Sequence, residues 1–282
     1  MGAYLDLVRA GNLAVSFAGT FVAGLAALGR GIPLDPAVLA ALALAGLSTA
    51  CVTAGGNVLN DLGDRASDRV NHPGRPLVTG AVSPAAARRL TVLLFVGSGL
   101  LILPLVLARP LLVPILASAI LTVAAYEFRL KRWGLSGNAA VAYLTAAVFL
   151  YGGAAGGDPL LLAPLAAMAF GATLSREIIK DMEDASGDVD RRTVPRVLGM
   201  SVAAGAARGS VAIAIALSPL PILTFVDRTS VSGIIYLVLV AAADALFVAS
   251  VAWLPRRPHQ EQSVSKAAMT VALAAFLATA FR

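Results

Sequence analysis

Six aspartates occur in two groups of three that share one spacing. The groups are Asp61, Asp64 and Asp68, and Asp181, Asp184 and Asp188. On a helix, positions i, i+3 and i+7 place their side chains on one face. Carboxylates gathered beside an apolar segment repel one another, and a divalent cation with oxygen ligands relieves that repulsion. We therefore expect all six aspartates to be Mg²⁺ ligands that hold a metal–diphosphate between the two groups.

Asparagines extend the first group along the same face. Asn57 and Asn60 precede it at helical spacing, and an amide oxygen suits a hard divalent cation as a carboxylate does. We expect Asn60 to act with the aspartates in catalysis and Asn57 to contact substrate. The alternative is an ordinary solvated helix end whose acids pair with Arg65 and Arg69. The recurrence of the spacing 120 residues later favours the metal site.

Two basic residues accompany the second group. Arg176 and Lys180 lie on the same predicted helix as Asp181 and Asp184. A guanidinium and an ammonium bind phosphate oxygens, so we expect both residues to bind substrate while the aspartates hold the metal. They would also neutralise the neighbouring acids, and one of them could have that structural role alone. Charges beside a bilayer are costly, which favours a function for them.

The composition places these residues in an all-α, polytopic membrane protein. Of the 282 residues, 58% are hydrophobic and 13% are charged, with a mean hydropathy of +0.82. Soluble proteins have about 45–50% apolar and about 25% charged residues. A membrane helix needs about 20 apolar residues, and the alternation of apolar runs and polar breaks predicts nine such helices. Their ranges are 11–29, 35–59, 84–107, 110–127, 136–154, 159–180, 200–225, 231–254 and 264–281.

The basic residues predict an orientation. Lys and Arg together number 22, and such residues concentrate in the cytoplasmic loops of membrane proteins. With the amino terminus inside, the outside loops hold only Arg30, Arg109 and Arg228. Both aspartate groups then lie on the cytoplasmic side of a cell membrane. This bias explains the net charge of +6, so we expect no nucleic-acid partner.

We expect one membrane domain over residues 1–282, because no linker or low-complexity segment interrupts the chain. The longest polar stretches, 60–83 and 181–199, carry the aspartate groups, and long loops between helices are usually functional or disordered. Cys51 is the only cysteine, which excludes a disulfide framework. Arg208 and Asp244 lie inside the seventh and eighth predicted spans, where a pair between them would satisfy both.

These motifs resemble the signatures of the UbiA family of intramembrane prenyltransferases. The first signature, Asn-x-x-x-Asp-x-x-x-Asp, matches Asn60, Asp64 and Asp68, and a second aspartate-rich signature matches the group that begins at Asp181. Further segments resemble one branch of the family, which makes archaeal-type ether lipids. These segments are 8–12, 137–145, 175–184 and 218–221, so the resemblance covers nearly the whole chain. The sequence Arg-Pro-Leu-Val-Thr-Gly at 75–80 departs from that branch, which commonly has a second proline there.

The resemblance implies nine helices around a central cavity that is capped by cytoplasmic loops and open sideways to lipid. It implies Mg²⁺ as the cofactor and geranylgeranyl diphosphate as the prenyl donor. In the matching branch the acceptor is geranylgeranylglyceryl phosphate, whose free hydroxyl attacks C1 of the donor to form the second ether bond. Both substrates carry geranylgeranyl chains, so they would meet the enzyme within the membrane lipid.

An anionic acceptor needs cations of its own. Candidates in the cytoplasmic segments are Arg9, Arg75, Arg129, Lys131 and Arg132, with Tyr126 as a hydroxyl donor. Of these we favour Arg75 and Lys131, which lie in the two loops nearest the aspartate groups. The alternative for each is a topological role, since basic residues are enriched in cytoplasmic loops in any case.

Three other functions fit parts of this pattern. A UbiA-type enzyme acting on an aromatic acceptor would share all six aspartates. A cation-coupled transporter would place its acids near the bilayer midplane, where only Asp244 lies. An alcohol phosphatidyltransferase also uses aspartates at the membrane edge, but the Asp-Gly and Ala-Arg placements expected for it are absent. The aromatic acceptor is therefore the nearest alternative.

Overall fold

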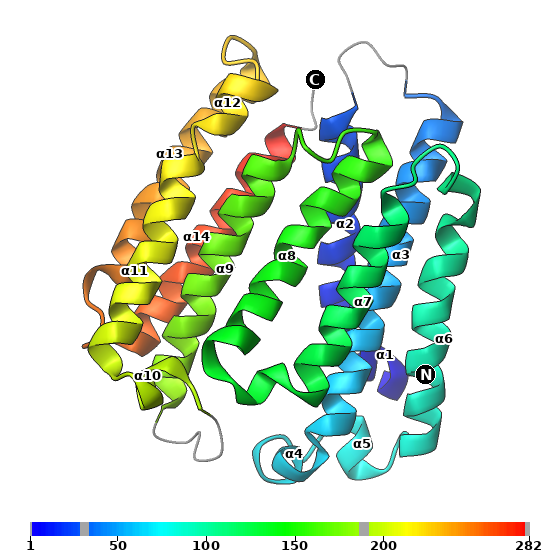
Figure 1. The fold of residues 1–282 in the computed structure, drawn as a ribbon, viewed down its shortest axis with the longest axis vertical. Helices are drawn as coiled ribbons and strands as arrows, with labels where there is room; N and C mark the ends of the chain where they lie inside the picture. Colours follow the sequence, from blue (N-terminus) through cyan, green and yellow to red (C-terminus); the bar gives the residue numbers. More distant parts are fainter. Residues whose placement is uncertain (1, 29–33, 186–191, 280–282) are drawn as a thin grey trace. The chain divides into compact units, whose positions relative to one another are not determined.

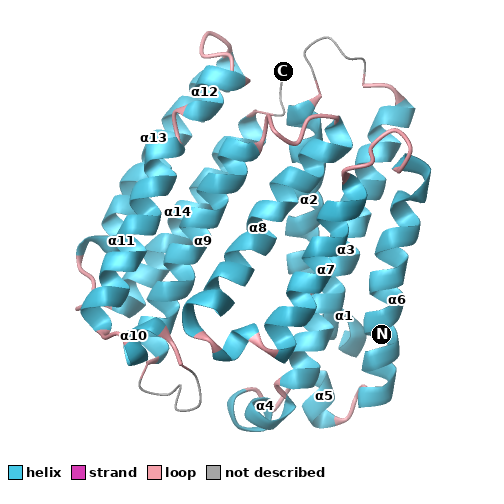
Figure 2. Ribbon diagram, viewed as in Figure 1, coloured by secondary structure: helices cyan, strands magenta, loops and turns pink. Residues whose placement is uncertain are grey.

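The computed structural model describes residues 2–28, 34–185 and 192–279. Within these ranges every regular element is a helix and no strand occurs (Figure 2). The chain divides into two compact units. Figure 1 labels the helices in chain order. One contains residues 1–127 and 151–159, and the other contains residues 128–150 and 160–282. The all-helical fold class predicted from the sequence is confirmed.

The first unit is built around α3. Its helices are α1 (Gly2–Val8), α2 (Ala10–Ala27), α3 (Pro36–Gly63), α4 (Arg65–Asn71), α5 (Pro76–Thr79), α6 (Pro84–Ile102), the 3₁₀ helix η1 (Leu103–Leu105), all but the last residue of α7 (Leu112–Phe128) and the end of α8 (Gly134–Gly156). α3 packs against both α2 and α6. Its residues Leu42, Ala45 and Val52 are buried in the apolar core of this unit. The last turn of α3 carries the beginning of the first aspartate group.

The helix starts follow from local sequence. Asp35 precedes Pro36, and its carboxylate accepts a hydrogen bond from the Val38 N–H group at 2.8 Å. Ser83 caps α6 in the same way, just before Pro84. A side-chain oxygen at this position satisfies an N–H group that has no helical partner, and proline fits the first helical position. The Asp35 cap determines where α3 begins, and the 28 residues of this helix then extend to the first aspartate group.

Polar bonds and small residues hold the helices of the first unit close together. The Ser48 hydroxyl donates to the Ser98 carbonyl at 2.8 Å and lies 2.9 Å from the Tyr151 hydroxyl, which links α3, α6 and α8. At Gly152 a Cβ atom would overlap the side chain of Ala23, so only glycine permits this approach of α8 to α2. Interhelical hydrogen bonds and small residues are the usual means by which membrane helices associate.

The second unit packs α9 against α11 and α14, and it packs α13 against the same two helices. Its elements are the 3₁₀ helix η2 (Leu130–Arg132), the first part of α8, α9 (Ala163–Asp184), α10 (Val194–Val197), α11 (Met200–Leu217), α12 (Leu220–Thr224), α13 (Val231–Ala252) and α14 (Pro258–Ala278). Ile178, Ile179 and Met182 near the end of α9 are buried in its core. At 3.6 residues per turn this leaves Lys180 and Asp184 on the exposed side of the helix.

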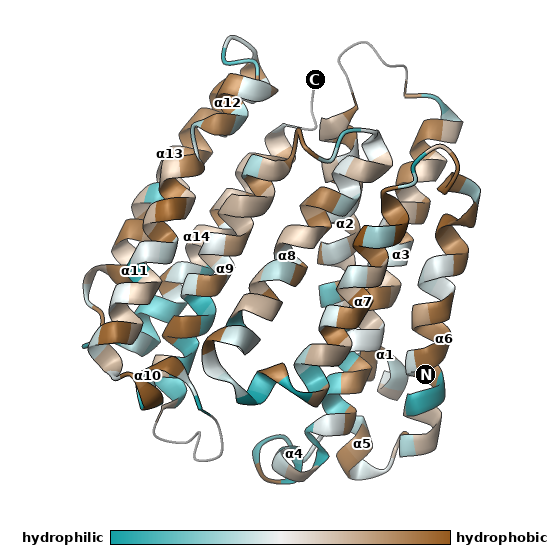
Figure 3. Ribbon diagram, viewed as in Figure 1, coloured by the Kyte–Doolittle hydropathy of each residue, from teal (hydrophilic) through white to brown (hydrophobic). Residues whose placement is uncertain are grey.

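Six helical segments among the described residues are long and apolar enough to cross a membrane. They are α2, α3, α6 with η1, α8, α11 with α12, and α13. In the described part of the chain, nine helices of 17 to 28 residues fall one in each predicted range, and α7, α9 and α14 complete that set. Figure 3 shows the long helices mostly brown or pale, with hydrophilic residues gathered towards helix ends. The chain is therefore a multi-pass membrane protein, and the crossing of all nine helices stays a prediction.

The predicted pair between Arg208 and Asp244 is wrong. Arg208 on α11 donates through Nε to the Val251 carbonyl at 3.2 Å and through a terminal nitrogen to the Leu254 carbonyl. Asp244 instead accepts a hydrogen bond from the Ser218 hydroxyl at 2.6 Å. Val251 lies seven residues beyond Asp244, about 10 Å along α13, so the guanidinium is too far away. Arg208 caps the carboxyl end of α13, where carbonyl groups lack helical partners.

Candidate active site

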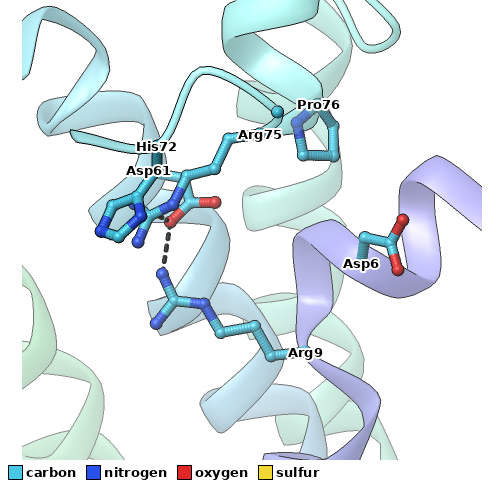
Figure 4. A pocket seen from close by; sticks show the side chains of 7 residues that line it. Asp6, Arg9, Asp61, His72, Arg75 and Pro76 are labelled. Carbon is cyan, nitrogen blue, oxygen red and sulfur yellow. Dashed lines mark hydrogen bonds and ion pairs between the residues drawn. The ribbon is translucent and has the colours of Figure 1, made fainter. Parts of the chain in front are cut away.

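Asp61 and two arginines form an ion cluster at the end of α3. Asp61 lies in the last turn of this helix and is only 3% exposed. Its Oδ1 atom accepts from Arg9 at 2.6 Å and from Arg75 at 3.1 Å (Figure 4). Arg9 stands at the junction of α1 and α2, and Arg75 immediately precedes α5. A buried carboxylate is costly without partners, and these two charge-assisted hydrogen bonds satisfy it.

Arg9 is held in a left-handed backbone conformation, with φ 57° and ψ 69°. Among the described residues no other non-glycine residue has a positive φ. Asn57, one turn before Asp61, donates from Nδ2 to the Val8 carbonyl at 2.8 Å and so holds the end of α1. A strained residue persists only where its surroundings fix it, and the Asn57 hydrogen bond and the Asp61 ion pair do so here. Asn57, predicted to contact substrate, thus places its amide on the backbone of α1.

Arg75 brings Asp61 and Asp68 together. One of its terminal nitrogens lies 3.1 Å from Asp61 Oδ1 and 2.6 Å from Asp68 Oδ2. The two aspartates belong to different helices, because α3 ends and α4 begins on either side of Asp64. Asp64 has φ −91° and ψ 7°, so the first group does not continue along one helix as its spacing predicted. Arg75 therefore holds the carboxylates of Asp61 and Asp68 close together, as a continuous helix would otherwise have done.

A pocket of about 350 Å³ opens beside this cluster. It is lined by Asp6, Arg9, Asp61, His72, Gly74, Arg75 and Pro76 (Figure 4). The side chains of Arg9 and Arg75 are 35% and 25% exposed, whereas that of Asp61 is covered. His72 adds an exposed imidazole to the pocket wall. The pocket therefore offers N–H donors to an anion.

Asn60 joins Asp64 to a buried glutamate. Its Nδ2 atom donates to Asp64 Oδ2 at 3.0 Å and to Glu127 Oε2 at 3.2 Å. Glu127 lies in the last turn of α7 and is 9% exposed. Glu127 was not predicted as a site residue, although its position gave a signal: it is the only acid in the predicted span 110–127 and stands at the end of that span. An acid placed there is costly unless it has a partner or a function.

The second aspartate group lies at the end of α9. The half-buried Asp181 accepts from Asn138 Nδ2 at 2.8 Å through its Oδ2 atom. Asn138 belongs to α8 and is 7% exposed. Asp184 is the last residue of α9 and is exposed, three positions beyond Asp181 and therefore on the same helical face. Asp188 lies outside the described residues.

The remaining cations and hydroxyls predicted to bind substrate are spread over several elements. Arg176 on α9 lies 2.6 Å from Glu177 Oε1 through one terminal nitrogen, which is the neutralising role considered for it. Lys180 is exposed near the end of α9. Tyr126 on α7 and Lys131 on η2 are half-buried. Contact of these four basic or hydroxyl side chains with substrate stays a prediction.

The donor chemistry of both groups suits Mg²⁺, which takes carboxylate and amide oxygens. Within the described residues no three acidic, histidine or cysteine side chains are preassembled around a metal position. Mg²⁺ is commonly held by one or two carboxylates together with substrate phosphates and water, rather than by a complete protein cage. Asn60 with Asp64, and Asn138 with Asp181, are donor sets of that kind.

Apolar helices with oxygen-rich and arginine-rich ends define a multi-pass membrane protein with polar sites at the ends of its helices. The chain belongs to the UbiA prenyltransferase family, whose model matches residues 16–279. It is therefore a prenyltransferase, and the resemblance drawn from its aspartate motifs is confirmed.

Curated relatives match over nearly the full chain. A digeranylgeranylglyceryl phosphate synthase of Natronomonas pharaonis is 37% identical over 276 residues, which cover 97% of this chain and 95% of the relative. A protein of the same name from Methanopyrus kandleri is 38% identical over 288 residues, covering 99% of both chains.

Solved structures share the fold. The structure of a digeranylgeranylglyceryl phosphate synthase in membranes has a TM-score of 0.81 at 30% identity, covering 99% of this chain and 98% of its own. A UbiA homolog from Archaeoglobus fulgidus, bound to DMAPP and Mg²⁺, has a TM-score of 0.66 at 17% identity over 97% of this chain and 98% of its own. At that identity the second likeness concerns the fold alone.

Proposed function

We propose that this prenyltransferase transfers the geranylgeranyl group of geranylgeranyl diphosphate to the free hydroxyl of geranylgeranylglyceryl phosphate. The product carries the second ether bond of an archaeal-type membrane lipid. The observation that carries this proposal is the identity of 37–38% to two digeranylgeranylglyceryl phosphate synthases over almost the entire chain. The arginine pocket beside Asp61 supports it, since an acceptor that bears a phosphate group needs cations to bind it.

Mg²⁺ is the cofactor that we propose for the reaction. Its ligands would be the carboxylates of Asp64, Asp68, Asp181, Asp184 and Asp188. Asp68 would offer its Oδ1 atom, because its Oδ2 atom pairs with one guanidinium, that of Arg75, at 2.6 Å. When bound, Mg²⁺ neutralises the diphosphate and stabilises the charge that develops on it as the leaving group. Asn60 orients the Asp64 carboxylate by its hydrogen bond at 3.0 Å, and Asn138 orients that of Asp181 at 2.8 Å. Such second partners hold a ligand in the rotamer that binding requires.

The reaction exchanges one bond at C1 of the donor for another. The bond from C1 to the diphosphate oxygen breaks and leaves its electron pair on the diphosphate. The acceptor's hydroxyl oxygen bonds to C1, and its proton passes to the released diphosphate or to water. Because the allylic C1 bears positive charge, the hydroxyl needs no strong base. Arg176 and Lys180 are the residues that we propose for the donor diphosphate, with Lys131 and Tyr126 near the acceptor.

We also propose that the whole chain acts as one membrane domain whose amino terminus and aspartate groups face the cytoplasm. The support is the bias of its basic residues toward one set of loops. Single cysteines would test this orientation. They would be placed in the 60–83 loop and at position 109, and labelled from outside intact cells. Labelling of the 60–83 loop from outside would contradict the orientation.

The proposed acceptor is tested with purified protein in lipid nanodiscs. Radiolabelled geranylgeranyl diphosphate and Mg²⁺ would be supplied with geranylgeranylglyceryl phosphate or with an aromatic acceptor such as a hydroxybenzoate. We expect product with the glyceryl phosphate and loss of that product when the metal is chelated. Turnover with the aromatic acceptor alone would contradict the proposal and favour the quinone-type alternative.

A further inference from the structure

The environment of Asp61 differs from that of a magnesium ligand. Its carboxylate is 3% exposed, and its Oδ1 atom already accepts from Arg9 at 2.6 Å and from Arg75 at 3.1 Å. Mg²⁺ binds oxygen at about 2.0–2.1 Å and keeps several waters. An ion on this oxygen would lie beside two permanently charged guanidinium groups, which would repel it. Asp61 is therefore poorly suited to the metal role that its spacing predicted.

The two arginines keep unused donors. Each guanidinium has five N–H groups. Arg9 uses one terminal nitrogen on Asp61, and Arg75 uses one terminal nitrogen on Asp61 and Asp68. Both side chains line the same pocket and remain 35% and 25% exposed. Figure 4 shows them converging on Asp61 from different segments of the chain, with His72 alongside.

Arg9 and Arg75 share the Asp61 carboxylate, so these three side chains carry a net charge of +1 without a metal. A phosphate monoester carries about −1.5 to −2 charges near neutral pH and has three acceptor oxygens. Arginine pairs held in place by a shared carboxylate present planar donor groups that match such a phosphate. Asp6 is the remaining acid of the pocket wall, and it is exposed to solvent, which screens its repulsion.

The backbone conformation of Arg9 also supports an anion-binding site at this pocket. Arg9 is the residue in the left-handed conformation, and Asn57 holds the preceding carbonyl at 2.8 Å. A strained arginine aimed at a pocket is a costly arrangement that persists where the surroundings fix it, as happens at ligand sites.

We propose that Asp61 is a positioning residue, and that it holds Arg9 and Arg75 as a metal-free binding site for the phosphate monoester of the acceptor. This inference rests on the proposed function, because it names the part of the enzyme that recognises the glycerophosphate head group. The other phosphate source is the donor's diphosphate, which would bind with Mg²⁺ at the remaining carboxylates. The two sources predict different kinetic constants for the same variants.

The test compares Asp61→Asn, Arg9→Gln and Asp64→Asn with the matched control Arg69→Gln. Arg69 is an exposed arginine on α4, outside the pocket wall. For the Asp61, Arg9 and Arg69 variants one measures the KM of acceptor and donor and the Mg²⁺ concentration for half-maximal rate, whereas Asp64→Asn is compared by binding alone. Binding of geranylgeranylglyceryl phosphate is measured separately by calorimetry in nanodiscs with a chelator present, so that the result does not depend on turnover.

We expect Asp61→Asn and Arg9→Gln to raise the acceptor KM and the metal-free Kd by about tenfold or more, because charge-assisted hydrogen bonds to the phosphate are lost. The donor KM and the Mg²⁺ midpoint should stay at wild-type values. In contrast, Asp64→Asn should bind the acceptor with the wild-type Kd when a chelator is present. Arg69→Gln should match the wild type throughout.

Opposite patterns overturn the proposal. If Asp61→Asn shifts the Mg²⁺ midpoint or the donor KM and leaves the acceptor constants unchanged, Asp61 serves the metal or the donor. If Asp61→Asn does not fold, Arg9→Gln and Arg9→Gly decide, since glycine accepts the left-handed backbone without strain. Wild-type acceptor affinity in either Arg9 variant would refute the site. Failure of the proposed function is a separate result: the wild type would then form no product from geranylgeranylglyceryl phosphate.

Discussion

Replacing Asn57 with alanine tests how the Arg9 junction is held. The variant removes one hydrogen bond, from Asn57 Nδ2 to the Val8 carbonyl at 2.8 Å. Such a bond contributes about 0.5–1.5 kcal/mol net. The left-handed conformation of Arg9 costs about 1–3 kcal/mol, so the bond that is lost is comparable with the strain that it offsets. Without it the junction between α1 and α2 should relax and withdraw the Arg9 guanidinium from Asp61.

The expected increase in the acceptor KM follows from the free energy of that hydrogen bond. A loss of 0.5–1.5 kcal/mol in positioning corresponds to an increase of about two- to thirteenfold in the acceptor KM, with donor KM and Mg²⁺ dependence unchanged. In the Asn57→Ala background, Arg9→Gln should raise the acceptor KM by a smaller factor than it does in the wild type, because both changes act on the same guanidinium. The assay is a double-mutant cycle on the acceptor KM, with the exposed Asn71→Ala on α4 as control.

Two results would refute this reasoning. An unchanged acceptor KM in Asn57→Ala would mean that the hydrogen bond does not position Arg9. Full additivity of Asn57→Ala and Arg9→Gln would mean that Asn57 acts on its own, as a direct substrate contact would.

Three further predictions concern the metal groups and the helix contacts. Asp64→Asn and Asp184→Asn should each abolish turnover and weaken the Mg²⁺ dependence while the helical circular dichroism stays unchanged, and full activity in either would contradict a shared metal site. Tyr151→Phe should lower unfolding stability in detergent by about 0.6–1.7 kcal/mol, since it removes an interhelical hydrogen bond, and Ser48→Ala should cost more because it leaves the buried Tyr151 hydroxyl unpaired. Arg208→Met should lower stability by about 1–3 kcal/mol with kcat retained, as measured by thermal unfolding beside the product assay; a loss of kcat at unchanged stability would assign Arg208 to the reaction instead.

Helix positions and the family could be predicted from the sequence because both depend on local patterns. Apolar runs of membrane length place a helix in each predicted range, and caps such as Asp35 with Pro36 determine where one begins. The signature residues Asn60 and Asp64 also keep their predicted neighbourhood, since they stand four positions apart on one helix end.

The roles within the aspartate group could not be predicted, because they depend on partners that are distant in sequence. Asp61 meets Arg9 across 52 positions, and Asn60 meets Glu127 across 67. Spacing alone treats Asp61 and Asp64 as equivalent acids, although Asp61 accepts from two guanidinium groups and Asp64 accepts from the amide of Asn60. The turn at Asp64 could not be predicted from the spacing either. Helical spacing shows which residues would share a face if the helix continued, but it does not show where the helix ends.

The contact between Asn57 and the end of α1 has a practical consequence for expressing and handling this enzyme. Residues 2–8 are held beside the arginine-lined pocket through one backbone carbonyl, that of Val8, and the neighbouring Leu7 is completely buried. A bulky fusion or purification tag at the amino terminus would pull on that segment and shift Arg9 by way of Val8. Such a preparation would retain its fold and its metal response while losing affinity for the acceptor, and it would be mistaken for an enzyme with a different substrate. A carboxy-terminal tag avoids that error.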